Sequence, residues 1–399
     1  MPIDATRIEQ LIDWLIDGAR PATGPNGPFQ ETCERLLAAG LPLARVALFI
    51  KTLHPDVYGR AFFWHPGEDV VTSTADIDIE QTPAFATSPI AAVHRSRREL
   101  RCRLDDPASR RFPYLDELRG EGVTDYIALP LHFTDGSVHV VTCTTKRQCG
   151  FADEHLDVLR RIAAPMARVA EIIQLRRTAA ILLDTYVGNS AGERILGGQI
   201  RRGHAESMQA AIWLSDLRGY TALSDRLAPE IVVEILNDYF DCQVPAIRKH
   251  GGEILKFMGD GLLAVFPIAS ADPDVGAVCA QVLNAAREAR TNVVAMRHGS
   301  DEAAEGFRFG VALHVGDILF GNIGGSGRLD FTCIGPAVNL AARLEKIAGR
   351  LGRTVVASSS FAGLCAREWA DLGEFAIEGL SSAQRVYGLH DEMAAEVPR

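Results

Sequence analysis

Residues 255–266, LKFMGDGLLAVF, consist of two apolar runs on either side of Gly259, Asp260 and Gly261. The pattern predicts a β-hairpin, because glycine and aspartate tolerate the positive φ angles that tight hairpin turns require. By itself it favours Asp260 as a turn residue and Lys256 as a charge on an edge strand. A catalytic role is compatible with the same structure, since rigid scaffolds often present reactive groups at strand tips. The rest of the chain must distinguish the two interpretations.

The composition favours two or three globular domains and argues against several classes of protein. The chain has 399 residues, of which 47% are hydrophobic, enough for more than one core. Its net charge of −10 argues against a general nucleic-acid-binding surface. No run approaches the roughly 20 apolar residues that a membrane span requires. The start, MPIDATRIEQ, lacks the basic-then-apolar pattern of a signal peptide, so we expect a cytoplasmic location.

The cysteines give no sign of a disulfide framework or a zinc site. Eight of them are scattered along the chain, with no C-x-x-C pair and no Cys/His cluster at zinc-binding spacing. Without an export signal, we expect free thiols in a reducing compartment, most of them serving as small core residues.

The first 183 residues show an order of elements that ends in a long amphipathic helix. From about 156 to 183, apolar residues recur at helical spacing, and FTDG (133–136) joins two strand-like runs as a hairpin. The apolar stripe of the helix consists of Leu159, Ile162, Met166, Val169 and Ile173. The other expected elements are helices over 1–20 and 29–40 and strands over 45–53, 59–65, 125–133 and 137–145.

This order, together with the segment CGFADEHLDVLRRIAAPMARVAEIIQLRR (149–177), resembles a GAF-type sensory domain. The resemblance implies a GAF-like regulatory domain at 1–170, with an unidentified small-molecule or other signal, followed by a signalling helix and connector at 171–207. A generic α/β domain that only helps the chain to dimerise is the alternative. The apolar stripe suggests that the helix pairs in parallel with the same helix of a second copy and transmits the signal.

Residues 208–391 predict the order β-α-β-β-α-β, which is that of a ferredoxin-like core. Pro245 should kink or end the first long helix. The fold class is α+β, an α/β sandwich with this core at the C-terminus, completed by a short strand pair and followed by a tail at 392–399. The expected elements are a strand over 208–215, a helix reaching about 250, the hairpin, a helix over about 272–297, a strand pair from 306, a helix over 336–349, and a strand and a helix from 352.

Two aspartates suggest a metal and phosphate site in this core. Asp216 ends the first strand, and Asp260 sits at the hairpin tip. In a ferredoxin-like sheet these strands are neighbours, so the two carboxylates can face each other and bind Mg²⁺ or Mn²⁺. The glycine-containing turn after Asp216 leads into a helix, whose first backbone N–H groups can hold phosphate oxygens. The sequence therefore predicts a site for a nucleoside triphosphate.

Three segments in this region, WLSDLRGYTALSD, HGGEILKFMGDGLLAVFP and FTCIGPAVNLAARLE, resemble the class III nucleotidyl cyclase catalytic domain. The similarity covers about 208–391, nearly half of the chain. It implies that Asp216 and Asp260 hold two Mg²⁺ or Mn²⁺ ions per active site. It also implies that the turn with Gly219, Tyr220 and Thr221 binds the substrate.

The resemblance assigns Lys256 and Thr332 to recognition of the purine base. Guanylate cyclases usually carry Glu and Cys at these two positions, so this pair favours ATP. An ammonium can donate to adenine N1, and a hydroxyl can adapt to the exocyclic amine. The alternatives are an exposed edge lysine for Lys256 and an ordinary strand threonine for Thr332.

Asn339 and Arg343 are four residues apart on a predicted helix and therefore share a face. In the family the asparagine orients the ribose, and the arginine stabilises charge on the α-phosphate. The alternative is a solvated helix face with Arg343 paired to an acid. In the family, a lysine commonly binds the terminal phosphates of the substrate. The resemblance places Arg353 at the position of that lysine.

Two positions depart from the usual pattern of the family without removing a reactive group. Trp213 replaces a phenylalanine, which changes packing. Pro336 replaces the aspartate of the common IGDAVN segment. Because proline suits a first helical turn, it should only set the entry to the following helix.

The resemblance implies an adenylate cyclase that converts ATP to 3′,5′-cyclic AMP and pyrophosphate by attack of the ribose 3′-hydroxyl on the α-phosphate. In the family the aspartates come from one subunit, and the asparagine and arginine come from the other. The full set occurs once in this sequence, which implies a homodimer with two sites. The alternatives are a guanylate cyclase and an inactive cyclase-like binding module. Regulation by bicarbonate or redox state stays open.

Overall fold

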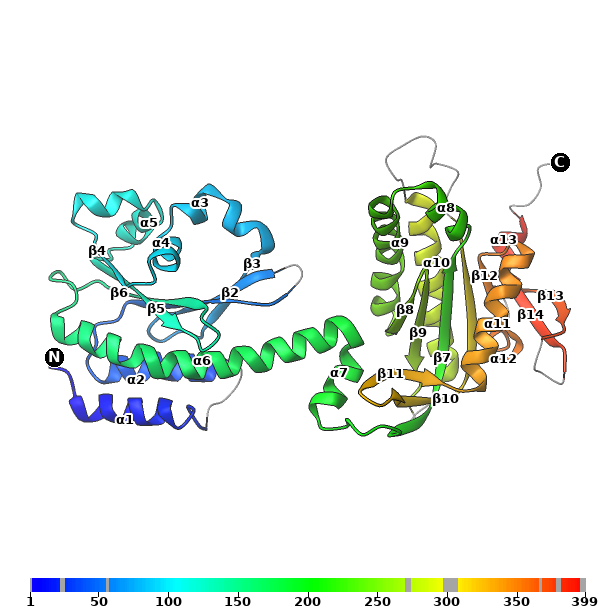
Figure 1. Cartoon of the computed structure of the whole chain (residues 1–399), viewed down its shortest axis with the longest axis horizontal. Helices are drawn as coiled ribbons and strands as arrows, with labels where there is room; N and C mark the ends of the chain where they lie inside the picture. The colour runs from blue at the N-terminus through cyan, green and yellow to red at the C-terminus, as the bar shows by residue number, and fades with distance from the viewer. Residues whose placement is uncertain are drawn as a thin grey trace. The chain divides into compact units, whose positions relative to one another are not determined.

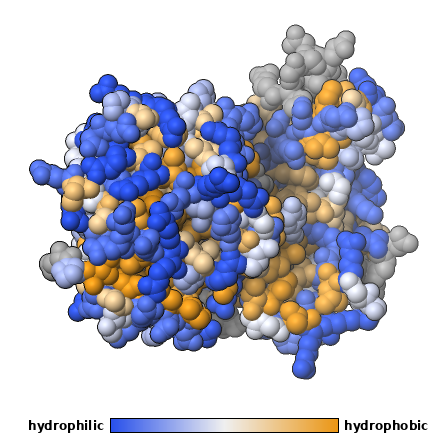
Figure 2. All heavy atoms as spheres, turned by 60° about the vertical axis from the view of Figure 1, so that its left-hand side comes forward, coloured by the Kyte–Doolittle hydropathy of each residue, from blue (hydrophilic) through white to orange (hydrophobic). Residues whose placement is uncertain are grey.

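The computed structural model describes residues 2–21, 26–54, 57–269, 274–296, 308–365, 368–377 and 382–394. The chain divides into two compact units, Met1–Leu182 and Leu183–Arg399 (Figure 1). Within the described ranges, no helix is both long and apolar enough to cross a membrane. On the face drawn in Figure 2, hydrophilic side chains are interspersed with hydrophobic ones.

The N-terminal unit contains a six-stranded antiparallel sheet in the order β3-β2-β1-β6-β5-β4. The strands are β1 (Arg45–Lys51), β2 (Val57–Trp64), β3 (Val71–Asp76), β4 (Leu100–Arg103), β5 (Asp125–His132) and β6 (Val138–Thr145). The helices are α1 (Ala5–Ile16), α2 (Gly27–Ala38), α3 (Pro83–Ala86), α4 (Pro89–Ser96), α5 (Tyr114–Gly120) and α6 (Asp153–Val187), with 3₁₀ turns at Ile77–Gln81 and Pro107–Arg111.

Two apolar layers cover the two faces of this sheet. Val46, Leu48 and Ile50 alternate along β1 and pack with α1, α2 and α6, whereas Tyr126 and Ala128 of β5 pack with α4 and α5. The four strands expected from the sequence are confirmed. Strand β3, VTSTAD, was missed because its exposed residues show no apolar alternation, and β4 was missed because it has only four residues.

The apolar stripe of α6 corrects one expectation. Leu159, Ile162, Met166 and Val169 are buried in the core of their own unit, and Ile173 packs against that core. These side chains are therefore not available to pair with a second copy of the helix. The sequence shows the period of the stripe but not which surface covers it, and here the covering surface belongs to the same chain.

The C-terminal unit contains an eight-stranded sheet in which the order β13-β14-β12-β10-β7-β9-β8 forms the main path and β11 pairs with β10. The central order β10-β7-β9-β8 confirms the ferredoxin-like core. The strands are β7 (Ala205–Leu217), β8 (Glu253–Met258), β9 (Gly261–Pro267), β10 (Phe309–Gly325), β11 (Arg328–Ile334), β12 (Val355–Ser358), β13 (Trp369–Phe375) and β14 (Gln384–Leu389).

Helices cover both faces of the C-terminal sheet (Figure 1). The alternating residues of β7 explain why: Ala211 and Trp213 pack on the side of α9 and α10, whereas Ala210 and Ile212 pack on the side of α7 and α11. The helices are α7 (Asn189–Leu196), α8 (Tyr220–Arg226), α9 (Pro229–Lys249), α10 (Val275–Ala295), α11 (Pro336–Leu351), α12 (Ser359–Ala362) and α13 (His390–Ala394).

Two further expectations need correction or refinement. Helix α9 continues through Pro245 to Lys249, so the proline does not end it. The segment expected as a plain connector contains α7. Its Ala191 is buried, and the backbone N–H of Ser190 donates to the Glu253 carboxylate at 2.8 Å. This part of the connector is therefore packed onto the C-terminal core. Of the expected tail, residues 395–399 lie outside the described part of the chain.

Candidate active site

The candidate site is centred on two carboxylates at one end of the C-terminal sheet. Asp216, near the end of β7, lies opposite Gly261 of β9 in the strand register. Gly259 has a φ of 67° and turns the hairpin, so that Asp260 comes beside Asp216. A Cβ atom at position 261 would lie 3.1 Å from the Ser215 carbonyl oxygen, which explains the second glycine of the turn. The predicted hairpin and strand pairing are both confirmed.

The electrostatics of this pair fit a cation site. Burial, and then hydrogen bonding and repulsion from Asp260, raise the pKa of Asp216 to about 7. Two carboxylates that resist joint ionisation are a hard oxygen donor set suited to Mg²⁺ or Mn²⁺. No group of three or more His, Cys, Asp or Glu side chains with metal-binding geometry occurs in the described residues. Such a pair matches sites where substrate phosphates complete the coordination of Mg²⁺.

The turn after Asp216 has the open geometry that a phosphate group requires. Gly219 has a φ of 78°, and no atom lies within 4 Å of where its Cβ would be. It precedes α8, which has seven residues and begins with Tyr220 and the exposed Thr221. The three residues therefore follow directly from the strand that carries Asp216.

Arg218 in this turn makes a contact that sequence reasoning missed. Its Nη1 lies 2.7 Å from Oε1 of Glu345 on α11, whose side chain is only 9% exposed. A Cβ atom at Gly310 or Gly349 would lie 1.7 Å or 2.6 Å from the guanidinium, so both glycines leave room for it. From the sequence, Arg218 is only a charged residue close to Asp216. Its partner could not be identified, because the pairing depends on the tertiary fold.

A second polar cluster lies on β8 and β11. The Lys256 ammonium pairs with the carboxylate of Asp330, and Thr332 follows two residues later on the same strand face. Phe331, between them, is buried on the other face. Sequence reasoning named Lys256 and Thr332 but not Asp330. The position of Asp330 two residues before Thr332 was the signal that could have identified it.

Asn339 and Arg343 lie on the exposed face of α11, whereas Ala341 and Leu344 of the same helix are buried. Pro336 is the first residue of α11, as expected of a proline that sets the entry to a helix. Arg353 follows α11 and donates from Nη1 to the backbone carbonyl oxygen of Glu392 at 3.1 Å.

Comparison with known proteins gives these arrangements a context. The sequence model of the adenylate and guanylate cyclase catalytic domain matches residues 204–391, and that of the GAF domain matches residues 28–170. Both predicted resemblances are therefore confirmed.

Two curated relatives each match about two-fifths of the chain. An adenylate cyclase of Anabaena cylindrica is 31% identical over 161 residues, which are 40% of this chain and 32% of the relative. Adenylate cyclase 1 of Rhizobium meliloti is 30% identical over 178 residues, which are 43% of this chain and 26% of the relative. The chain thus spans about a third or less of the length of these relatives.

Solved structures with similar folds include both adenylyl and guanylyl cyclases. The adenylyl cyclase CyaB from P. aeruginosa is 25% identical, with a TM-score of 0.39, over 47% of this chain and 95% of that chain. The guanylyl cyclase Cya2 is 26% identical, with a TM-score of 0.36, over 46% of this chain and 93% of that chain.

Proposed function

Because this chain carries an adenylate and guanylate cyclase catalytic domain preceded by a GAF domain, we propose that it is an adenylate cyclase that acts as a homodimer under control of its N-terminal domain. The reaction is the conversion of ATP to 3′,5′-cyclic AMP and pyrophosphate. The single observation that carries the proposal is the facing carboxylate pair of Asp216 and Asp260, the second of which lies four residues beyond Lys256 on the same hairpin.

The carboxylate pair serves to hold two divalent cations and, through them, the triphosphate. When bound, such cations supply positive charge that eases ionisation of the 3′-hydroxyl and stabilises the charge that develops on the phosphates. Asp216 comes from β7 and Asp260 from the turn that leads into the adjacent strand β9, so the fold brings them together before substrate arrives. This preorganisation reduces the cost of assembling the site at each turnover.

The helix residues supply the second half of the site. Asn339 orients the ribose, so that the 3′-oxygen lines up with the α-phosphorus and the bond to pyrophosphate. The Arg343 guanidinium, a fixed fork of donors, stabilises the charge on the α-phosphate as the new P–O bond forms. Both residues are exposed in one chain, which supports their delivery to the site of a second copy. We assign binding of the substrate phosphates to the turn at Gly219, Tyr220 and Thr221. Arg353, which follows α11, is assigned to the same role.

Base selection rests on Lys256 and Thr332. The Lys256 ammonium donates to the N1 acceptor of adenine, whereas N1 of guanine carries a hydrogen and needs an acceptor. The second candidate function, guanylate cyclase, is favoured by one observation: Asp330 places a carboxylate acceptor beside Lys256. We assign Asp330 to holding Lys256 in position, which leaves the ammonium as the group that meets the base.

The test is product formation by the full chain with ATP or GTP, in the presence of Mg²⁺ or Mn²⁺. Cyclic AMP formation that falls in Lys256→Met, with little cyclic GMP, is the expected result. Cyclic GMP as the main product, lost in Asp330→Asn, would establish the second candidate. ATP binding in calorimetry without any cyclic product would instead identify an inactive binding module.

A further inference from the structure

The N-terminal unit contains a cavity on the side of its sheet that α2 and α6 cover. Fourteen described residues line it, ten of them apolar, including Phe29 of α2, Leu48 of β1, and Met166 and Ile173 of α6. The centre of a water molecule could move through about 50 Å³ of this hollow. A hollow of this kind suits a small apolar group, such as a short alkyl chain or a single ring.

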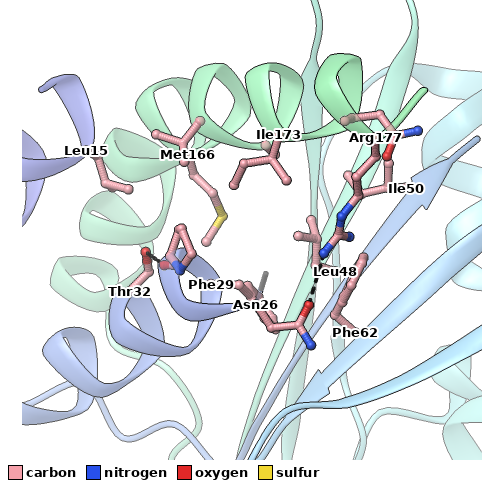
Figure 3. Close-up of a pocket in the computed structure, with 14 residues that line it drawn as sticks. Leu15, Asn26, Phe29, Thr32, Leu48, Ile50, Phe62, Met166, Ile173 and Arg177 are labelled. Atoms are coloured by element: carbon pink, nitrogen blue, oxygen red, sulfur yellow. Dashed lines mark hydrogen bonds between the residues drawn. The ribbon is translucent and has the colours of Figure 1, made fainter. Parts of the chain in front are cut away.

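A single charged side chain stands among the described residues that line the cavity. Arg177 of α6 directs its guanidinium toward Asn26 and Phe62 (Figure 3). Its Nη2 lies 3.3 Å from Oδ1 of Asn26, and its Cζ lies 5.4 Å from the centre of the Phe62 ring. Burial, together with the nearby charge of Arg60, lowers the pKa of Arg177. An anion at this end of the cavity would stabilise the charged guanidinium against both burial and the repulsion from Arg60.

Two further polar side chains of the cavity bond within their own helices, and Asn26 also donates from Nδ2 to Thr72 Oγ1 at 3.3 Å. Thr32 Oγ1 donates to the carbonyl oxygen of Pro28 at 2.7 Å, and Gln174 Nε2 donates to Thr178 Oγ1 at 3.3 Å. The cavity therefore combines an apolar body with a guanidinium at one end. This is the usual design of a small-molecule site, in which apolar walls bury most of the ligand and a few polar groups orient it.

We propose that this cavity binds a small monocarboxylic acid with an apolar body, the carboxylate paired with Arg177 and the body packed against Phe29, Met166 and Ile173. A planar guanidinium and a carboxylate can form two parallel hydrogen bonds, which fix the orientation of the ligand. An apolar ligand with a neutral polar end would fill the same walls but would leave this interaction unmade.

The site gives a ligand direct contact with a helix that extends beyond it. Met166, Val169, Ile173 and Arg177 come from one side of α6, and the same helix continues to Val187. A ligand that fixes these side chains changes the rotational and translational freedom of α6, so we assign the acid a regulatory role. This part of the inference rests on the proposed cyclase function, whereas the binding itself does not.

Binding is tested by calorimetry of the full chain with hexanoate and with 1-hexanol, which share an apolar body. Hexanoate should bind about tenfold more tightly, because hydrogen bonds to charged groups are the stronger ones. Arg177→Gln should remove this preference, whereas the adjacent exposed Arg176→Gln, with the same change of charge, should retain it. Ala170→Leu fills the cavity and should weaken the binding of both probes. Ala180→Leu is its matched control on the same helix.

Equal affinities for the two probes, undiminished hexanoate binding by Arg177→Gln, or no binding of either probe at millimolar concentrations would overturn the proposal. The regulatory role is tested separately, by the effect of hexanoate on cyclic nucleotide formation. Binding without any cyclase activity in any condition would contradict the proposed function and leave the site standing. An active cyclase whose rate ignores bound hexanoate would contradict only the regulatory role.

Discussion

The carboxylate pair and the exposed face of α11 differ in how complete they are within one chain. Asp216, near the end of β7, and Asp260, in the neighbouring hairpin turn, are both half-buried, and Asp260 contributes to the raised pKa of Asp216. Asn339 and Arg343 lie on an exposed helix face. In the proposed active site, one half would therefore be preformed within a chain, whereas the other half would be presented outward. This is the arrangement that a site shared between two copies requires.

One contact joins the two halves inside the chain. Arg218 follows the strand that carries Asp216 and pairs with Glu345 on α11, the helix of Asn339 and Arg343. A displacement of α11 is therefore opposed by an ion pair that is anchored beside the carboxylates. The predictions below remove first one half, then the other, and then this connection.

Disruption of the carboxylate pair should have the largest effect on activity. Asp260→Ala should lower the rate of cyclic nucleotide formation by about 1,000-fold or more, because it removes half of the oxygen donors for the cations. The measurement is kcat for the purified variant, with circular dichroism to show that it is folded. Asp317→Ala, the same change at an exposed strand carboxylate, should keep most of the activity.

Loss of an exposed residue of α11 should lower the activity less. Arg343→Ala should lower kcat by about 100-fold, the usual effect of losing one donor to a transition-state charge. Unfolding of the variant should be unchanged, since the side chain is exposed. Arg350→Ala, at another exposed arginine of α11, is the control. Equal kcat values for the two variants would argue that Arg343 has no part in the reaction.

The connecting ion pair should matter for stability as well as rate. Arg218→Met leaves the Glu345 carboxylate buried without its partner, which should lower the free energy of unfolding by about 3 kcal/mol. The double variant Arg218→Met/Glu345→Met should recover much of this loss, because no buried charge remains. Urea unfolding of the three proteins measures the effect. A double variant that is less stable than Arg218→Met would contradict this account of the contact.

The raised pKa of Asp216 gives a smaller, pH-dependent effect. Without metal, the folded chain retains a proton up to about pH 7 that the unfolded chain, with an ordinary aspartate, loses near pH 4. The folded state binds more protons in this window, so stability should fall as pH rises from about 4 to about 7. Mn²⁺ should therefore raise Tm more at pH 8 than at pH 5. Asp216→Asn should abolish the difference.

The limits of sequence prediction follow from the same contrast. The hairpin at 255–266 and its pairing with the first strand could be predicted, because turn residues and element order are local or topological features. Asp330 as the partner of Lys256, and Glu345 as the partner of Arg218, could not, because each partner lies far away along the chain. The stripe of α6 was predicted correctly as a stripe but given the wrong surface, since periodicity does not identify what covers it.

The most direct test of the central claim, that each site takes its two halves from different chains, is a pair of mixed dimers isolated with two different tags. A dimer of Asp260→Ala with Arg343→Ala has one intact site if the halves come from different chains, and should show about half of the wild-type activity. A dimer of wild type with the doubly substituted chain then has no intact site and should be nearly inactive. The reverse result, an inactive first dimer and a half-active second, would place both halves in one chain and contradict the account.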